Sequence, residues 1–159
     1  MSKIKKIIFA NDHAGTELKF KLIEHFKKKY EIINHGTNEI TPVDYPDYAR
    51  LMVNDILDGG ENVIGIAICG TGVGMSIALN KFKNILCGNI FLSETAALAR
   101  EHDNCNVIAL SARFVSVEEN IKIVENYLNA VFEIRHDRRI KKIHEIENEN
   151  YISIKNAQS

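Results

Sequence analysis

Short apolar segments alternate with longer segments of helical periodicity along this chain, which predicts an α/β protein with a parallel sheet covered on both faces. The chain has 159 residues, of which 45% are hydrophobic and 26% are charged. This size and balance are typical of one globular domain with a proper core, and we expect a single domain over residues 1–159.

The first part of the chain predicts two strands and two helices. Residues 6–10, which are apolar after Lys6, predict a strand that ends at a polar turn. Apolar side chains then recur at helical spacing over residues 18–26, with lysines on the opposite side. A short strand follows at 31–34. A second amphipathic pattern over 48–57 predicts a helix that ends at Gly59 and its following glycine.

The apolar segment 63–68 predicts a buried strand that ends at Cys69, and residues 76–81 predict a short helix of small residues. Ser93 is a candidate N-cap for the next helix. The other expected elements are strands at 85–90 and 106–110, helices at 93–101, 117–127 and 137–147, and a polar, frayed tail at about 149–159. Together they predict a Rossmann-like three-layer α/β/α sandwich with a five-stranded parallel sheet and an extra C-terminal helix.

The segment Cys69-Gly70-Thr71-Gly72-Val73-Gly74 carries the strongest functional signal. A glycine loop between a strand and a helix presents backbone N–H groups in a field that favours anions and thiolates. The plainer interpretations are a tight turn and a buried hydrophobic cysteine. A dinucleotide-binding loop fits poorly because this loop follows the third expected strand rather than the first.

Polar residues follow three expected strands: Asp12 with His13, Cys69 with its loop, and Ser111 to Arg113. Ligands of parallel sheets bind beyond the carboxyl ends of the strands, so we expect these groups to lie together. Asp12 can equally cap a helix, and His13 can fill a turn.

His102 ends one helix, where a cation suits the helix dipole, and it can also transfer protons near neutral pH. Arg135 and Arg139 are four residues apart on the last helix, a spacing that suits a phosphate dianion or an ordinary solvated helix end. Proton transfer on a small phosphorylated molecule fits this set of groups.

The chain resembles ribose-5-phosphate isomerase type B, of the family that also contains the galactose-6-phosphate isomerase subunits. The resemblance covers nearly the whole chain. It rests on Asp12-His13-Ala14-Gly15, Asp44-Tyr45-Pro46-Asp47-Tyr48-Ala49, the segment from Cys69 to Ala78 with Asn80-Lys81, Arg100-Glu101-His102, Asn106 to Leu110, Arg113, and Arg135-His136 with Arg139.

The resemblance implies isomerisation of ribose 5-phosphate to ribulose 5-phosphate through an enediolate, with no cofactor and no metal. The implied catalytic residues are Cys69 as the base, Thr71, His102 for ring opening and Asp12. The implied substrate-binding residues are His13, Tyr45, Gly70, Gly72, Val73, Gly74, Asp103, Arg113, Arg135 and Arg139. A homodimer or dimer of dimers is also implied, with the site between subunits and with the His102 segment and Arg113 coming from the partner.

The sequence departs from the family pattern in two segments. Asp103 stands where asparagine is typical, and a carboxylate only accepts hydrogen bonds. Relatives often have two glycines where this chain has Glu133 and Ile134, so we expect the last helix to start differently from theirs.

Charge and composition exclude several kinds of binding partner. The net charge of -1 argues against nucleic-acid binding, and no apolar segment approaches a membrane span. Three cysteines without a C-x-x-C motif, and no apparent secretory signal, favour a cytoplasmic protein. The alternatives left open are an isomerase of allose or galactose 6-phosphate, a noncatalytic sugar-phosphate-binding protein and a nucleotide-binding module.

Overall fold

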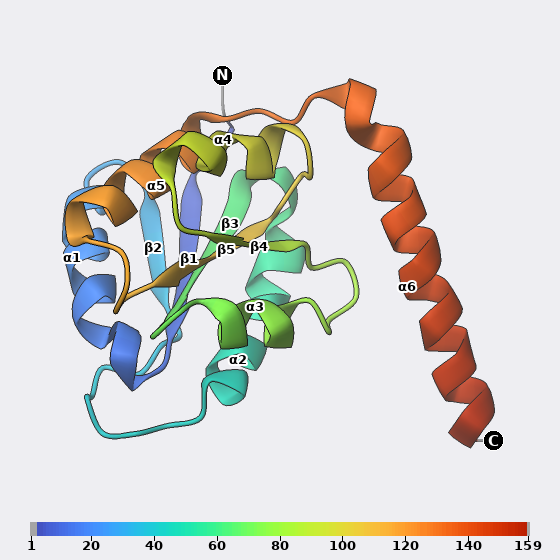
Figure 1. Ribbon diagram of the computed structural model, residues 1–159, viewed down its shortest axis with the longest axis horizontal. Coiled ribbons are helices and arrows are strands. Elements are labelled where there is room, and N and C mark those ends of the chain that lie inside the picture. The colour runs from blue at the N-terminus through green and yellow to red at the C-terminus, as the bar shows by residue number, and fades with distance from the viewer. Residues whose placement is uncertain (1–2, 159) are drawn as a thin grey trace.

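The computed structural model describes residues 3–158, and it confirms a five-stranded, all-parallel sheet between two layers of helices (Figure 1). The strands are β1 Lys6–Asn11, β2 Glu31–Asn34, β3 Val63–Cys69, β4 Cys87–Ile90 and β5 Val107–Ser111. The helices are α1 Thr16–Phe26, α2 Tyr45–Gly59, α3 Val73–Leu79, α4 Ser93–Glu101, α5 Val117–Asn129 and α6 Asp137–Gln158, with short 3-10 turns η1 His13–Gly15, η2 Gly60–Asn62 and η3 Ile134–His136.

The strand order is β2-β1-β3-β5-β4. The chain moves outward from β1 to β2 and then returns to add β3 on the other side of β1. The order therefore reverses between β1 and β3, where a parallel sheet opens a crevice beyond its carboxyl ends. Asp12 directly follows β1 and Cys69 ends β3, so both lie at this reversal point.

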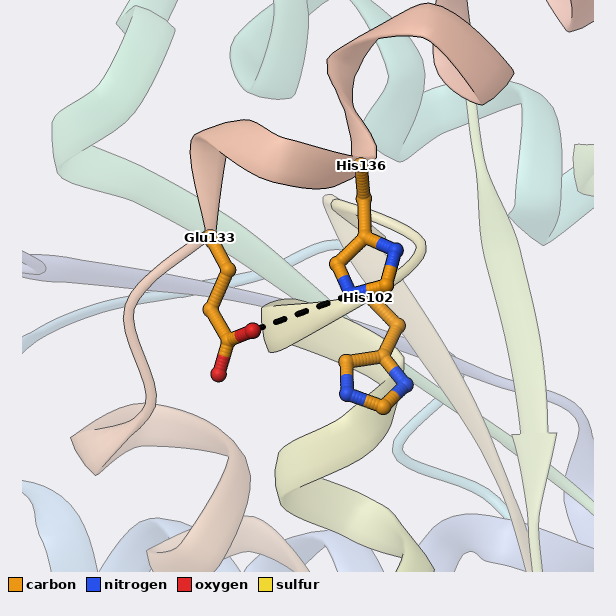
Figure 2. Close-up of side chains that lie close together, drawn as sticks. All are labelled: His102, Glu133 and His136. Atoms are coloured by element: carbon orange, nitrogen blue, oxygen red, sulfur yellow. Dashed lines mark ion pairs between the residues drawn. The ribbon is translucent and has the colours of Figure 1, made fainter.

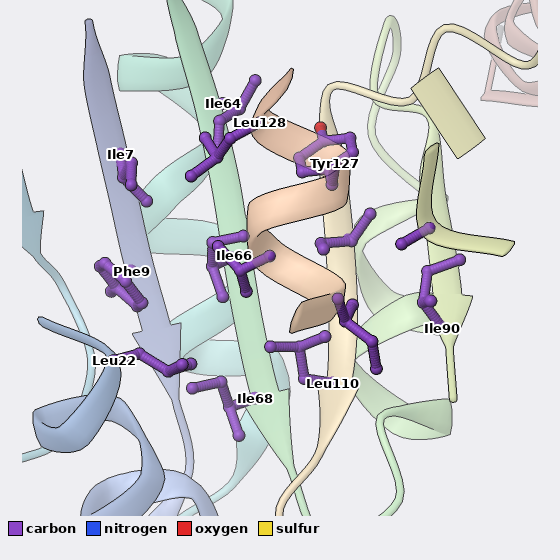
Figure 3. Close-up of a cluster of buried hydrophobic side chains, with 14 of the residues drawn as sticks. Ile7, Phe9, Leu22, Ile64, Ile66, Ile68, Ile90, Leu110, Tyr127 and Leu128 are labelled. Atoms are coloured by element: carbon purple, nitrogen blue, oxygen red, sulfur yellow. The ribbon is translucent and has the colours of Figure 1, made fainter. Parts of the chain in front are cut away.

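One face of the sheet packs against α1, α4 and α5 (Figure 3). Phe9, Ile66 and Ile68 project from the strands into a core that Leu22 of α1 and Tyr127 of α5 close from the helical side. All five side chains are at most 1% exposed. Strands covered on both faces need continuous apolar runs rather than alternation, which is why residues 63–68 are apolar throughout.

The other face packs against α2 and α3. Met52 and Ile56 of α2 and Met75 and Leu79 of α3 cover Ile8 of β1 and its neighbours in the sheet. Burial of such side chains contributes roughly 1.5–3 kcal/mol each. The short helix α3 is thereby anchored directly beneath the glycine loop.

Several element boundaries differ from the sequence-based expectation, among them the starts of α3 and α4 and the end of α6. Helix α3 begins at Val73 and not at 76. Gly72 is its N-cap and adopts a left-handed backbone (φ +82°), so the chain turns from the loop into the helix at the next residue. Ser93 is the first helical residue, and Leu92 occupies the N-cap position. The last helix continues to Gln158 and does not end near Glu147, since residues 137–158 contain no glycine or proline.

Helix α6 stands apart from the layered body, to which residues 130–136 connect it (Figure 1). Its Glu147 carboxylate accepts hydrogen bonds from the backbone N–H of Asn84 at 3.0 and 3.1 Å. None of the helices within residues 3–158 combines the length and the apolarity that a bilayer span requires.

Candidate active site

The loop after β3 folds back on its own cysteine. The backbone N–H of Gly72 donates to Cys69 Sγ at 3.1 Å, and the thiol is only 4% exposed. The exposed Thr71 accepts a hydrogen bond from the Val73 N–H at 3.2 Å through Oγ1. The loop therefore directs one of its own backbone N–H groups at the Cys69 sulfur.

The end of β1 places a carboxylate and an imidazole beside this loop. The backbone N–H of Asp12 donates to the carbonyl of Ile68, the residue before Cys69, at 3.2 Å. Asp12 also caps η1, because its Oδ1 accepts from the Ala14 N–H at 3.0 Å. His13 accepts a hydrogen bond at Nδ1 from the Val43 N–H at 3.2 Å. The capping interpretation of Asp12 is thus correct, and it is compatible with a role in the site.

Arg113 completes this edge of the sheet. Its backbone N–H donates to the Gly70 carbonyl at 3.0 Å, and a Cβ atom added at Gly70 would lie 3.2 Å from its Nη1. Ser111 donates from Oγ to the same carbonyl at 2.8 Å. Arg113 thus lies beside the Gly70 backbone of its own chain, because adjacent strands β3 and β5 end side by side.

Tyr45, the first residue of α2, lies over the loop. A Cβ atom added at Gly74 would fall 2.7 Å from Tyr45 Cζ, so the aromatic ring rests on the glycine backbone. Only glycine allows this approach without displacement of the ring. Tyr45 remains 37% exposed, which leaves part of the ring available to a ligand.

The remaining predicted residues lie at the amino-terminal edge of the sheet, around a second cluster that consists of His102, Glu133 and His136. Figure 2 shows these three side chains together. Helix α4 runs back from the carboxyl edge and ends next to His102, whose ring centroid lies 4.4 Å from that of His136. The connection to α6 is held there by the Glu133 N–H, which donates to the Glu101 carbonyl at 2.9 Å. This cluster and Cys69 are thus separated by the length of β3, on the order of 15–20 Å.

The exposed Arg135 and Arg139 belong to this second cluster, where both already have partners. Arg135 Nε donates to Glu133 Oε2 at 2.6 Å, and Arg139 Nη1 donates to His136 Nδ1 at 2.7 Å. The hydrogen bond from Arg135 lowers the pKa of Glu133. Burial, followed by the charges of Arg135, His102 and Arg139, lowers the pKa of His136. The cluster is therefore electropositive around one carboxylate.

This cluster contains three potential metal-ligand atoms that all lie within 4.8 Å of one another, one each from His102, Glu133 and His136. Histidine and carboxylate side chains also bind zinc in catalytic sites. The arginines argue against a cation here. Since an arginine only donates, His136 Nδ1 accepts, and in the neutral ring Nε2 carries the hydrogen rather than a lone pair. The donors of this cluster suit an anion better than a metal ion.

The structure therefore divides the predicted residues between two half-sites. The residues at the carboxyl edge are Asp12, His13, Tyr45, the loop Cys69 to Gly74, and Arg113. The residues at the amino edge are His102, the exposed Asp103, Arg135 and Arg139. The predicted meeting of Asp12, Cys69 and Arg113 is confirmed, whereas one chain does not bring Arg135 and Arg139 to Cys69.

Sequence reasoning did not predict that the polar residues that end β1 and β5 are buried. Asn11 and Ser111 are both fully buried. Asn11 Nδ2 donates to the Asp12 carbonyl at 2.8 Å. The hydrogen bond from Ser111 Oγ connects the Gly70 carbonyl to the end of β5. A polar residue that closes an otherwise apolar strand is the signal that could have identified them.

The chain is similar to known sugar-phosphate isomerases. A family model described as Ribose/Galactose Isomerase matches residues 7–143. The probable ribose-5-phosphate isomerase B of Mycoplasma pneumoniae is 50% identical over 140 residues, covering 86% of this chain and 91% of that protein. The ribose-5-phosphate isomerase B of Escherichia coli is 40% identical over 146 residues, covering 91% of this chain and 97% of that protein.

A crystal structure of ribose-5-phosphate isomerase B from Mycoplasma genitalium with bound ribulose-5-phosphate superposes with a TM-score of 0.86 at 46% identity. It covers 91% of this chain and 97% of the other. The fold, the order of the motifs and the coverage of both chains agree, and the chain belongs to the ribose/galactose isomerase family.

Proposed function

We propose that this chain interconverts ribose 5-phosphate and ribulose 5-phosphate through an enediolate, without a cofactor. The main structural support is the position of the Cys69 thiol. Its sulfur accepts a hydrogen bond from the Gly72 N–H, and it lies at the same edge of the sheet as Asp12 and Arg113. A relative that is 46% identical binds the product of this reaction, ribulose-5-phosphate. The free thiols of this chain suit the reducing cytoplasm.

In this mechanism the Cys69 thiolate removes the proton from C2 of the open-chain aldose. The C2–H bonding electrons form the C1–C2 double bond, and the former carbonyl oxygen becomes the enediolate oxygen. Backbone N–H groups between Gly70 and Gly74 stabilise that charge, which is where preorganised donors lower a barrier most. The thiol then returns the proton to C1, the proton of the C2 hydroxyl passes to the oxygen on C1, and C2 becomes the carbonyl carbon of the ketose. The Thr71 hydroxyl orients the intermediate during this step.

His13 and Arg113 bind the phosphate from the carboxyl edge, and Tyr45 contacts the sugar. A guanidinium offers paired donors that match phosphate oxygens. His13 suits the same task, because the Val43 N–H occupies its Nδ1 and leaves the hydrogen of the neutral ring on Nε2.

The second half-site comes from another copy of the chain. The partner subunit's His102 would assist ring opening, and the partner subunit's Arg135 and Arg139 would add donors for the phosphate. This arrangement is favoured because His102 lies at the opposite end of the sheet from Cys69 in its own chain. A two-fold dimer contains two such composite sites, and a dimer of dimers contains four.

Ketose formation from ribose 5-phosphate, followed by absorbance without added metal or cofactor, tests the proposal. Cys69→Ala should abolish turnover and still bind the sugar phosphate. Cys105→Ala is the matched control, because Cys105 is also a buried thiol but lies at the amino edge, and it should retain turnover. Unchanged turnover by Cys69→Ala would exclude Cys69 as the base.

Absence of ketose from a folded wild-type protein would contradict the proposal. Allose 6-phosphate and galactose 6-phosphate would then be the next substrates to test. Binding of these compounds without turnover would indicate a sugar-phosphate-binding protein.

A further inference from the structure

Lys19 is a buried cation that the proposed chemistry does not use. It lies on α1 and is 0% exposed. Burial lowers its pKa to about 8. Its Nζ donates to the Thr37 carbonyl at 2.5 Å and to Asn38 Oδ1 at 2.7 Å. A buried ammonium is costly unless it is hydrogen-bonded, so this lysine is bound firmly to residues 37 and 38.

Further donors hold the same segment against the end of β1. Asn11 Nδ2 donates to the Thr37 carbonyl at 3.1 Å, and Thr16 Oγ1 donates to the Glu39 carbonyl at 2.8 Å. Residues 37–39, called the pinned segment below, thus meet Lys19 and two buried neutral side chains. The ammonium makes the shortest of these contacts and is the only charged donor among them.

The connection that begins with the pinned segment returns to the carboxyl edge at Val43. There the Val43 N–H donates to His13 Nδ1 at 3.2 Å. Only the short span 40–42, which is exposed, separates the pinned segment from this contact. A displacement of residues 37–39 therefore moves the donor that sets both the tautomer and the direction of the His13 ring.

We propose that Lys19 is a positioning residue for phosphate binding: it fixes the pinned segment so that the Val43 N–H holds His13 with Nε2–H directed at the phosphate. This inference rests on the proposed function, in which His13 is a phosphate ligand. Lys19 itself does not contact the substrate. Its removal should weaken phosphate binding and spare the proton transfer at Cys69.

The experiment compares Lys19→Met with Lys19→Arg and with Lys21→Met, an exposed lysine on the same helix that pairs with Glu17. For Lys19→Met we expect KM for ribose 5-phosphate and the dissociation constant of inorganic phosphate, measured by calorimetry, to rise together by about tenfold. The kcat should stay within about twofold. Lys19→Arg should recover part of the affinity, and Lys21→Met should match the wild type. Asn38→Ala removes one acceptor of the ammonium, and it should raise both constants by about threefold if Lys19→Met does not fold.

A double-mutant cycle separates positioning from a general loss of structure. In a His13→Ala background, Lys19→Met should change phosphate affinity by less than about twofold. A repeat of the full tenfold loss, or a fall in kcat with unchanged phosphate affinity, would overturn the proposal. Phosphate calorimetry needs no turnover, so a wild type that binds phosphate but fails to isomerise ribose 5-phosphate refutes the proposed function alone.

Discussion

Replacement of Gly72 by alanine is the most informative test of how the loop is built. Gly72 has φ +82°, and an added Cβ atom would lie 2.4 Å from Asn89 Oδ1 and 3.2 Å from the backbone of Leu110. The left-handed backbone costs a non-glycine residue roughly 1–2 kcal/mol, and overpacking against fixed backbone adds about 1–3 kcal/mol. We therefore expect Gly72→Ala to lower the free energy of unfolding by about 2–5 kcal/mol.

Gly60→Ala is the matched control. Gly60 also has a positive φ, +56°, but a Cβ atom there would meet nothing within 4 Å. It lies at the other edge of the sheet, between α2 and β3. This variant should lose about 1–3 kcal/mol from backbone strain alone and keep its isomerase activity.

Denaturant unfolding and steady-state kinetics on both variants provide the measurements. Gly72→Ala should also reduce kcat/KM by at least about tenfold, because the Gly72 N–H moves away from Cys69 Sγ. This description of the loop would be refuted if Gly72→Ala kept its kcat/KM and had a free energy of unfolding within about 1 kcal/mol of the wild-type value.

Three further predictions follow from buried and charged groups. Tyr127→Phe should lower the free energy of unfolding by about 1–3 kcal/mol, because the buried Tyr127 hydroxyl donates to the Cys105 carbonyl at 2.7 Å; an unchanged unfolding midpoint would contradict this. Burial raises the pKa of Cys105 from 9.0 to about 12, so its contribution to stability is full below pH 9 and is lost as pH rises toward 12. Between pH 8 and 10 the wild type should lose about 1.4 kcal/mol more than Cys105→Ala, and equal losses in urea unfolding would argue against a protonated buried thiol. Asp103→Asn should raise kcat/KM by roughly twofold, because it removes a negative charge near an anionic substrate, and a decrease would show that the carboxylate assists binding.

The sequence predicted the sheet well because its central strands β1, β3 and β5 are buried on both faces. A continuous apolar segment such as 63–68 is stable only where both faces of the strand are covered. Because the strands are parallel, the polar residues that follow them lie at the same edge of the sheet. The convergence of Asp12, Cys69 and Arg113 depends only on strand direction and adjacency. It needs no knowledge of side-chain packing.

The division into two half-sites was harder to predict. The sequence shows that His102 ends a helix, but its distance from Cys69 follows from the direction in which that helix returns across the sheet. The pairing of Arg135 with Glu133 depends on side-chain geometry in the connection before α6, which periodicity does not encode. Lys19 was assigned to the lysine-rich face of its helix, and its burial depends on a loop that closes over it.

A subunit-complementation assay tests the composite site most directly. Cys69→Ala and His102→Ala should each be inactive alone as purified homo-oligomers. After mixed refolding, half of the dimers should be heterodimers with one intact site each, giving about a quarter of the wild-type ribose 5-phosphate turnover. No recovery from folded, mixed oligomers would show that Cys69 and His102 do not act in one site contributed by two copies of the chain.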